Sequence, residues 1–301
     1  MNEFDIVVVG GGIAGLTAGL TAARLGRRAL ILTGDQLGGN LLSIEKIEGF
    51  PGFAEGIAGF ELCPSVQMQA AEAGCEFETT EILALGGAPG AWQIKTADGD
   101  YTARAVILAT GASLKTLGVP GEEDFKGRGV SHCASCDAPL LRGQPAVVVG
   151  GGDSALQEAL TLANAGAPVT IVQKGAELTA QATYRERVAA EDKITVRCNE
   201  SVAEIVGSDG VTGVKLASGE TIPAGGVFVY IGFAPNTGYL AGKATLDAHG
   251  AIVTDGSLAT SLDGVFAAGA VRAGWAGRAA VSAGDGAAAA IAAEAYLAAK
   301  A

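Results

Sequence analysis

The chain has 301 residues, of which 49% are hydrophobic, and a formal net charge of −12 at pH 7. This acidic balance opposes partners that are bound through clustered Lys and Arg, so we expect neither nucleic acid nor a membrane surface as a partner. The length suits two domains, and 46 glycines suit a sheet-rich enzyme with many tight turns. Glycines break the first apolar run far short of a membrane span and no basic leader precedes it, so we expect a cytoplasmic protein.

Residues 4 to 34 read as a strand, a glycine-rich turn, a helix and a second strand. The sequence FDIVVVGGGIAGLTAGLTAARLGRRALILTG places Gly10, Gly12 and Gly15 between an apolar β-branched run and an Ala/Leu helix. Glycine at the first position permits a tight turn, at the second lets backbone approach a pyrophosphate, and at the third brings helix against strand. The helix N-terminus then faces the phosphates. This βαβ unit predicts dinucleotide binding.

The cysteines are few and scattered, at positions 63, 75, 133, 136 and 198. They are too few for a disulfide framework. Zinc usually takes four ligands, and the chain has one CxxC and only two histidines, so we expect no metal site. The notable feature is SHCASCDAP, in which Asp137 directly follows Cys133-x-x-Cys136. The other three cysteines, which lack a partner nearby in the sequence, are expected to be small buried or half-buried apolar residues.

A second fingerprint follows in PAVVVGGGDSALQEALTLANAGAPVTIVQKG, where Gly150, Gly152 and Ala155 again separate a Val-rich strand from a helix. Two such units in one chain suggest two nucleotides, typically a flavin and a nicotinamide that exchange electrons. The alternative is a degenerate duplicate that keeps the fold and binds nothing.

Two further apolar strands end in glycine, RAVILATG with Thr110 and Gly111, and DGVFAAG with Gly269. If both line one flavin, the first domain is discontinuous. We then expect a flavin domain formed by residues 1–112 and 243–301, and an inserted domain, residues 113–242, that carries the CxxC pair.

These motifs, in this order, resemble the low-molecular-weight thioredoxin reductases, FAD-dependent pyridine nucleotide-disulfide oxidoreductases, nearly end to end. TGDQLGGNL resembles the family's flavin-contacting loop, with Gly38, Gly39 and Asn40 where that loop wraps the flavin. GRGVSHCASCDAPL, GGGDSALQEAL, VFVYIGFAPNT and GVFAAGAVR with GRAAVSAGDGAAAA resemble the redox segment, the second nucleotide fingerprint, the return crossover and the C-terminal flavin segment. The resemblance implies an α/β protein with two Rossmann-like domains of three-layer ββα architecture, the second inserted into the first.

The same resemblance implies a redox chemistry. In that family FAD passes electrons to the CxxC disulfide, and the reduced pair exports them to a small dithiol protein after the two domains rotate. Cys136 would then lie against the isoalloxazine with Cys133 farther out, and Asp137 would exchange a proton with the dithiol, unless it merely caps a helix. His132 could tune Cys133, although a bystander imidazole is the simpler interpretation. The resemblance also implies a homodimer formed through the flavin domains.

On the flavin side the sequence departs from the family at three places. Ala270 replaces the acid of a Gly-Asp pair, an Arg-Gln pair becomes Arg278-Ala279, and Gly49 replaces an asparagine. Each lost hydrogen bond costs about 0.5 to 1.5 kcal/mol. Because the phosphate cradle persists, we expect weakened FAD binding, with partial loss of FAD during purification.

The expected 2′-phosphate site departs further. NADPH-using relatives carry His-Arg-Arg and a further Arg, where this chain has Gln173, Lys174, Gly175 and Thr179. Lys174 offers a point charge without the bidentate fork of arginine, and no acid stands at Gln173 to mark NADH. The donor therefore stays open between weak NADPH or NADH use and a different donor such as ferredoxin.

Three functions remain at this point. The leading prediction is an FAD-dependent reductase of the disulfide of thioredoxin or a thioredoxin-like protein. The second is a flavin-dependent dithiol oxidase that closes a disulfide in a small molecule with oxygen as acceptor. The third is a flavin-bound docking protein with an idle thiol pair.

Overall fold

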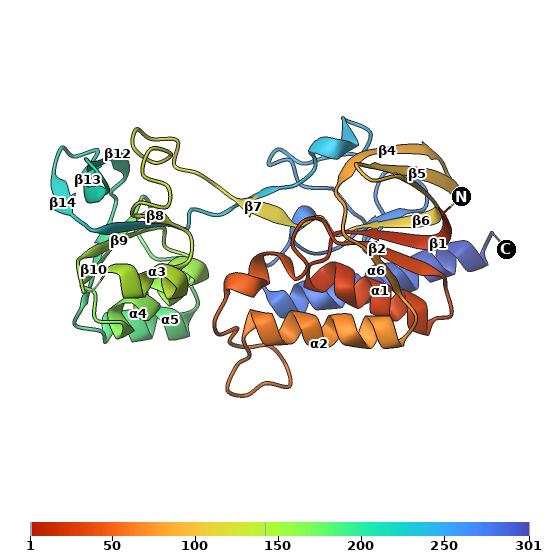
Figure 1. Cartoon of the computed structure of the whole chain (residues 1–301), viewed down its shortest axis with the longest axis horizontal. Coiled ribbons are helices and arrows are strands. Elements are labelled where there is room, and N and C mark those ends of the chain that lie inside the picture. The colour runs from red at the N-terminus through yellow and green to blue at the C-terminus, as the bar shows by residue number, and fades with distance from the viewer. Residues whose placement is uncertain (1, 142, 301) are drawn as a thin grey trace. The chain divides into compact units, whose positions relative to one another are not determined.

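The computed structural model describes residues 2–141 and 143–300. The chain divides into two compact units. Unit 1 consists of the residues up to Ser113 together with those from Ala234 onward, and unit 2 is the inserted segment Leu114–Phe233 (Figure 1). The return to unit 1 comes earlier than the expected residue 243. Contacts with distant residues of unit 1 fix this return, since the backbone N–H of Asn236 bonds to the carbonyl of Gly111 at 3.1 Å and Leu240 is buried in the core of unit 1.

A largely parallel sheet forms the centre of unit 1. Its strand order is β3-β2-β1-β6-β5-β4, with β17 paired to β6. Strands β1, β2, β3, β6 and β17 pair in parallel, whereas β4 and β5 continue the sheet as an antiparallel ribbon. The strands are β1 (Asn2–Val9), β2 (Ala29–Leu32), β3 (Glu76–Glu78), β4 (Ile82–Ala88), β5 (Ala91–Thr96), β6 (Asp100–Leu108) and β17 (Val265–Ala267).

Helices cover one face of this sheet (Figure 1). They are α1 (Ile13–Arg24), α2 (Gly59–Glu72) and α6 (Ala279–Ala298). Because successive strand residues point to opposite faces, Ile6 and Val8 pack with buried residues of the helices, while Val7 and Val9 pack on the other face with Trp92. The continuous apolar run of β1 is thus explained by burial on both faces.

Unit 2 has the same layers. Its parallel sheet has the order β11-β10-β9-β15-β8, and a meander of antiparallel strands has the order β12-β13-β14. Val148 of β9 packs with the helices, and its neighbours Val147 and Val149 pack with the meander. The helices are α3 (Ala134–Leu141), α4 (Asp153–Asn164) and α5 (Ala182–Ala189).

The strands of unit 2 are β8 (Val130–Ser131), β9 (Ala146–Val149), β10 (Val169–Gln173), β11 (Ile194–Cys198), β12 (Val202–Gly207), β13 (Val211–Leu216), β14 (Thr221–Pro223) and β15 (Gly226–Val229). The two segments where the chain crosses between units, β7 (Ala112–Leu114) and β16 (Phe233–Pro235), pair with each other. The predicted class is therefore confirmed: an α/β chain with two Rossmann-like units, the second inserted into the first.

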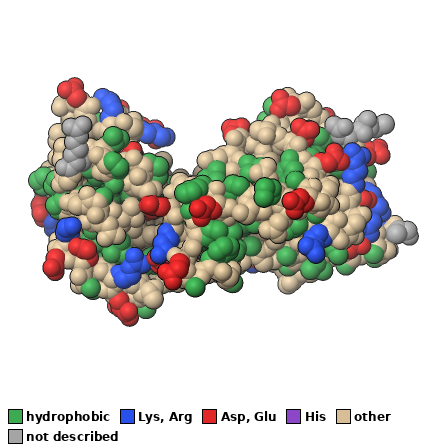
Figure 2. All heavy atoms as spheres, turned by 60° about the horizontal axis from the view of Figure 1, so that its bottom comes forward, with side chains coloured by type: hydrophobic (Ala, Val, Ile, Leu, Met, Phe, Trp, Pro, Cys, Tyr) green, Lys and Arg blue, Asp and Glu red, His purple; other side chains and the backbone are tan. Residues whose placement is uncertain are grey.

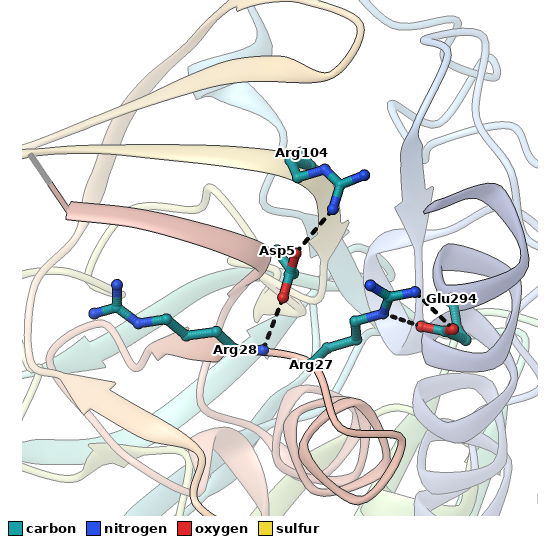
Figure 3. A network of polar contacts seen from close by, with 5 residues as sticks. All are labelled: Asp5, Arg27, Arg28, Arg104 and Glu294. Atoms are coloured by element: carbon teal, nitrogen blue, oxygen red, sulfur yellow. Dashed lines mark hydrogen bonds and ion pairs between the residues drawn. The ribbon is translucent and has the colours of Figure 1, made fainter. Parts of the chain in front are cut away.

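Polar contacts tie the start of unit 1 to its last helix (Figure 3). Asp5 of β1 accepts hydrogen bonds from the backbone N–H of Arg28 at 3.0 Å and from Arg104 at 3.1 Å. Arg27 donates hydrogen bonds to both carboxylate oxygens of Glu294 on α6. The hydrogen bond from Arg27 lowers the pKa of Glu294, as expected for a partly buried bidentate pair.

Charge is spread rather than clustered on the face drawn in Figure 2, where acidic and basic side chains are interspersed. Within the described residues, no helix combines the length and apolar character that a membrane span requires.

Candidate functional site

The three glycines of the first fingerprint have three different environments in unit 1. Gly10 has a φ of +116°, and a Cβ there would lie 2.2 Å from the carbonyl oxygen of Ala109. A Cβ on Gly15 would lie 1.8 Å from the carbonyl oxygen of Gly10. A Cβ on Gly12 would meet no atom of the described residues within 4 Å. Gly10 and Gly15 are thus required by the backbone itself, whereas Gly12 leaves open space.

The loop at 38–40 lies beside that open space. The backbone N–H of Gly38 bonds to the carbonyl of Gly11 at 2.8 Å, and Gly38 forms a bridge with Gly12. The position that a Cβ on Gly39 would take is 3.6 Å from the Cα of Gly12. Asn40 ties the loop to the segment after β6, since its amide donates to the carbonyl of Ala112 at 2.7 Å. The loop therefore forms a wall next to the start of α1.

The remaining predicted positions of unit 1 converge on the same edge of the sheet. Leu108 of β6 pairs with the last residues of both β1 and β17, so the segments that follow these three strands emerge at one level. Gly269 follows β17 with a φ of +74°, and a Cβ there would lie 2.9 Å from the Cβ of Ala14. Arg278 is the N-cap residue of α6, and Ala279 packs with Ile13 of α1.

Thr110 and Gly111, which are expected beside the cofactor, also hold the return segment of the chain. The Thr110 hydroxyl donates to the carbonyl of Asn236 at 2.8 Å, and the Asn236 amide donates back to the Thr110 carbonyl at 3.0 Å. Gly111 has a φ of +66°. These residues join the return segment to β6, a structural role that sequence reasoning did not anticipate.

These features fit a dinucleotide. Gly12 is the N-cap residue of α1 with extended backbone, and no side chain caps the helix there, so the first-turn amides are not satisfied by a capping side chain. Open space in front of a helix N-terminus suits a pyrophosphate. The residues of unit 1 that would hold FAD are therefore Gly12, the loop at 38–40 and the turn at Gly269.

The CxxC pair lies at the start of α3 in unit 2. Cys133 and Cys136 form a disulfide, and the backbone N–H of Cys136 donates to the Sγ of Cys133 at 3.3 Å. Cys136 is exposed and Cys133 half-buried. Asp137 stands in the first turn of α3, where its backbone N–H bonds to the carbonyl of Cys133. The neighbouring His132 donates from Nδ1 to the carbonyl of Val229 at 2.9 Å.

Sequence reasoning missed a carboxylate beside the pair. Glu158 of α4 accepts from the backbone N–H of Ala134, the first residue of α3, at 2.8 Å, and from the Tyr230 hydroxyl at 3.3 Å. Burial, reinforced by the charge of Glu158, raises the pKa of Tyr230, which keeps its hydroxyl a neutral donor. No local motif marks Glu158, because only the packing of α4 on α3 brings it to the cysteines.

In unit 2 the second fingerprint repeats the geometry of the first. Gly150 has a φ of +132°, and a Cβ there would lie 2.1 Å from the carbonyl oxygen of Tyr230. In the part of the chain that the structure describes, the one atom within 4 Å of a Cβ added to Gly152 is the Oγ1 of Thr179, at 3.9 Å. Ala155 is fully buried beneath the turn. The cradle itself could hold a pyrophosphate.

The segment after β10 folds back over this cradle. The backbone N–H groups of Thr179 and Ala180 both bond to the carbonyl of Gly151, and Asp153 accepts two hydrogen bonds from Gln181, at 2.7 and 2.8 Å. Lys174 is exposed. Lys174 is thus the cation that this segment would offer to a 2′-phosphate. Asp153, in the first turn of α4, adds a negative charge near the same cradle.

The other cysteines are not redox candidates. Cys63 and Cys75 are buried in unit 1, and burial raises their pKa values to about 11 and about 12. Cys198 is half-buried and free. Over residues 2–141 and 143–300, no group of three or more His, Cys, Asp or Glu side chains is arranged to hold a metal ion.

Comparison with known proteins decides the family. Residues 4–290 match the family model described as pyridine nucleotide-disulphide oxidoreductase. The chain is 39% identical to the thioredoxin reductase of Treponema pallidum, with 98% of each chain covered, and 40% identical to that of Mycolicibacterium smegmatis, with 98% of this chain and 96% of the relative covered. The crystal structure of Lactococcus lactis thioredoxin reductase superposes with a TM-score of 0.93 at 34% identity, covering 98% of this chain and 99% of the other.

The chain belongs to the thioredoxin reductase family. It is therefore an oxidoreductase, and the predicted resemblance is confirmed. Members of the family use FAD and NADPH.

Proposed function

We propose that this protein is an FAD-dependent disulfide reductase that passes electrons through Cys133 and Cys136 to thioredoxin or a similar dithiol protein. The observation that carries the proposal is the Cys133–Cys136 disulfide at the N-terminus of α3, in a chain whose other unit has an open dinucleotide cradle at Gly12. Unit 1 would hold FAD, and unit 2 would be the NAD(P)-binding-like domain that carries the redox pair.

The surroundings of the disulfide suit its reduction. Two electrons open the Cys133–Cys136 bond to one thiolate and, after uptake of a proton, one thiol. The N–H of Cys136, which already reaches the Sγ of Cys133, and the positive end of α3 both stabilise a thiolate there. Asp137 would move the proton to or from the dithiol. Bound FAD would carry the two electrons that reduce the disulfide.

Export of the electrons is thiol–disulfide exchange. One cysteine thiolate attacks a sulfur of the partner's disulfide, which gives a mixed disulfide and releases a partner thiolate. The second cysteine then attacks the mixed disulfide, so that Cys133–Cys136 re-forms and the partner leaves as a dithiol. The electron count closes, because the partner gains the two electrons that the pair loses.

The electron donor is the second part of the proposal. The cradle at Gly152 supports nicotinamide binding, but Lys174 alone would face a 2′-phosphate. We therefore propose slow use of NADPH and NADH with little preference between them, or a non-nicotinamide donor such as ferredoxin. Anaerobic stopped-flow reduction of the bound flavin by each nucleotide tests this, and fast reduction by micromolar NADPH with NADH far slower would contradict it. A homodimer formed through unit 1 belongs to the same proposal.

Serine variants test the redox pair. Cys133→Ser and Cys136→Ser should each abolish thioredoxin reduction while the flavin can still be reduced, and Asp137→Asn should slow turnover. Cys198→Ser is the matched control, because Cys198 is free and lies elsewhere in unit 2. Substantial disulfide reduction by either pair variant would refute the proposal.

The same preparations test the rival oxidase, which the reduced charge around Lys174 favours. Rapid oxygen consumption with a small dithiol, without thioredoxin reduction, would replace the reductase by a dithiol oxidase.

A further inference from the structure

A buried ion pair lies beside the cofactor cradle of unit 1. Asp285, in the second turn of α6, accepts from Arg272 Nε at 2.6 Å and from Arg272 Nη2 at 3.1 Å. The same carboxylate accepts from the backbone N–H of Gly269 at 3.1 Å. The side chains of Asp285 and Arg272 are only 10% and 18% exposed. Both carboxylate oxygens are therefore engaged, and one of them holds backbone.

The backbone that Asp285 holds is the short 3₁₀ turn Gly269–Val271. Its residues are Gly, Ala and Val, so none of its own side chains can fix it by a hydrogen bond. The turn follows β17 and touches α1, since a Cβ on Gly269 would lie 2.9 Å from the Cβ of Ala14. The residue after Asp285 touches α1 as well, because a Cβ on Gly286 would lie 2.1 Å from the Ala14 carbonyl oxygen.

The positive charge of Arg272 neutralises the negative charge of Asp285 beside the expected phosphate site. A carboxylate desolvated next to a phosphate site would repel the phosphates, and a bidentate guanidinium neutralises it. Arg272 is held in turn, since its Nη1 donates to the carbonyl of Ala273 at 3.2 Å. The pair thus fixes the turn without adding net charge beside the cradle.

We propose that Asp285 and Arg272 are a positioning pair: they fix the turn at Gly269 against the start of α1 and so set the affinity of unit 1 for FAD. The inference rests on the proposed function, because it assumes that the cradle at Gly12 binds FAD. Neither residue is assigned a contact with FAD. Their effect passes through the turn.

The molecule contains a matched control for this experiment. Arg27 and Glu294 form a second bidentate pair on α6, with side chains 22% and 26% exposed, that joins the helix to the segment after α1 (Figure 3). A purely structural role would make the two pairs equivalent, since each ties α6 to unit 1. A positioning role predicts that the pair at Asp285 alone changes FAD affinity.

The test measures the Kd of FAD for apo-protein by quenching of flavin fluorescence, together with the thermal midpoint of the apo-protein. Asp285→Asn and Arg272→Met should each raise the Kd about tenfold or more, because FAD binding must then order a turn that charge-assisted hydrogen bonds hold in place in the wild type. The double variant should be no worse than the singles, because the two residues act as a unit. Glu294→Gln should lower the thermal midpoint and leave the Kd within about twofold.

The turn has a second anchor, the bond from the N–H of Ile252 to the carbonyl of Val271 at 3.0 Å, so the variants should fold. If Asp285→Asn does not fold, Arg272→Lys retains the charge and loses the fork, and its Kd should still rise. If the wild-type protein binds FAD and the Asp285 and Arg272 variants bind it with the same Kd, this inference is wrong and the proposed function is unaffected. Wild-type protein that does not bind FAD would overturn the proposed function and this inference with it.

Discussion

Replacement of Gly12 by alanine should separate binding from folding, because it should weaken FAD binding while it leaves the stability of the apo-protein nearly unchanged. Gly12 has φ −73° and ψ 176°, a conformation that alanine adopts freely, and an added Cβ meets no atom of the described residues within 4 Å. The folded apo-protein should therefore tolerate the methyl group without strain. Loss of freedom in the unfolded chain, about 0.4 to 1 kcal/mol, is offset by the poorer N-cap that alanine provides for α1, so the stability of the apo-protein should stay within about 1 kcal/mol of wild type.

The same methyl group stands where the backbone would approach the pyrophosphate. One lost charge-assisted hydrogen bond is worth about 1.5 to 3 kcal/mol, so the Kd for FAD should rise at least tenfold. The assays are thermal unfolding of flavin-free protein and a fluorescence titration with FAD. Gly15→Ala is the contrasting variant, since its Cβ would lie 1.8 Å from the Gly10 carbonyl oxygen and should prevent correct folding. Gly12→Ala protein that loses well over about 1 kcal/mol of stability without FAD, or that binds FAD as tightly as wild type, would refute this reasoning.

Three further outcomes follow from buried and paired groups. Thr80→Val should raise the free energy of urea-induced unfolding by about 1 kcal/mol, because the buried Thr80 hydroxyl has no partner among the described residues, and a loss of stability would reveal one. The pKa of Glu294 is lowered from 4.5 in the folded chain, so the stability that its pair adds is complete above that value and is lost as pH falls; the gap between wild type and Glu294→Gln in urea unfolding should shrink below about pH 4. Iodoacetamide should label Cys133 and Cys136 of the reduced native protein, but not Cys63 or Cys75, as read by mass spectrometry.

The sequence predicts best those features that the backbone dictates locally. The roles expected of Gly10, Gly12 and Gly15 correspond to three measurable environments, because a tight turn, an open approach and a close helix–strand contact are each encoded within six residues. The CxxC pair is equally local, because Cys133 and Cys136 are three positions apart and form their disulfide where α3 begins.

What the sequence does not predict lies between distant segments. Glu158 reaches Ala134 across 24 positions. Asp285 reaches Gly269 from another element, although nothing in GAVR or GDG marks either residue as a partner. The early return at Ala234 has the same origin, since the bonds between Asn236 and Thr110 span 126 positions. Buried polar groups choose partners by packing, which a local pattern does not record.

The second fingerprint shows why a preserved motif is weak evidence for a bound nucleotide. Gly150 is needed by unit 2 whether or not a ligand binds, since any side chain there would strike the carbonyl of Tyr230. Ala155 is likewise fixed by burial. Gly152 is different, because a Cβ there would meet only the Oγ1 of Thr179 among the described residues, at 3.9 Å. The fold therefore does not require glycine at this position, whereas close approach of a ligand to the backbone would. That argues for a cradle that still accepts a pyrophosphate, while the single charge at Lys174 argues against strong selection of a 2′-phosphate. Under the proposed function, unit 2 would therefore hold a nicotinamide dinucleotide through its pyrophosphate and discriminate little between NADPH and NADH.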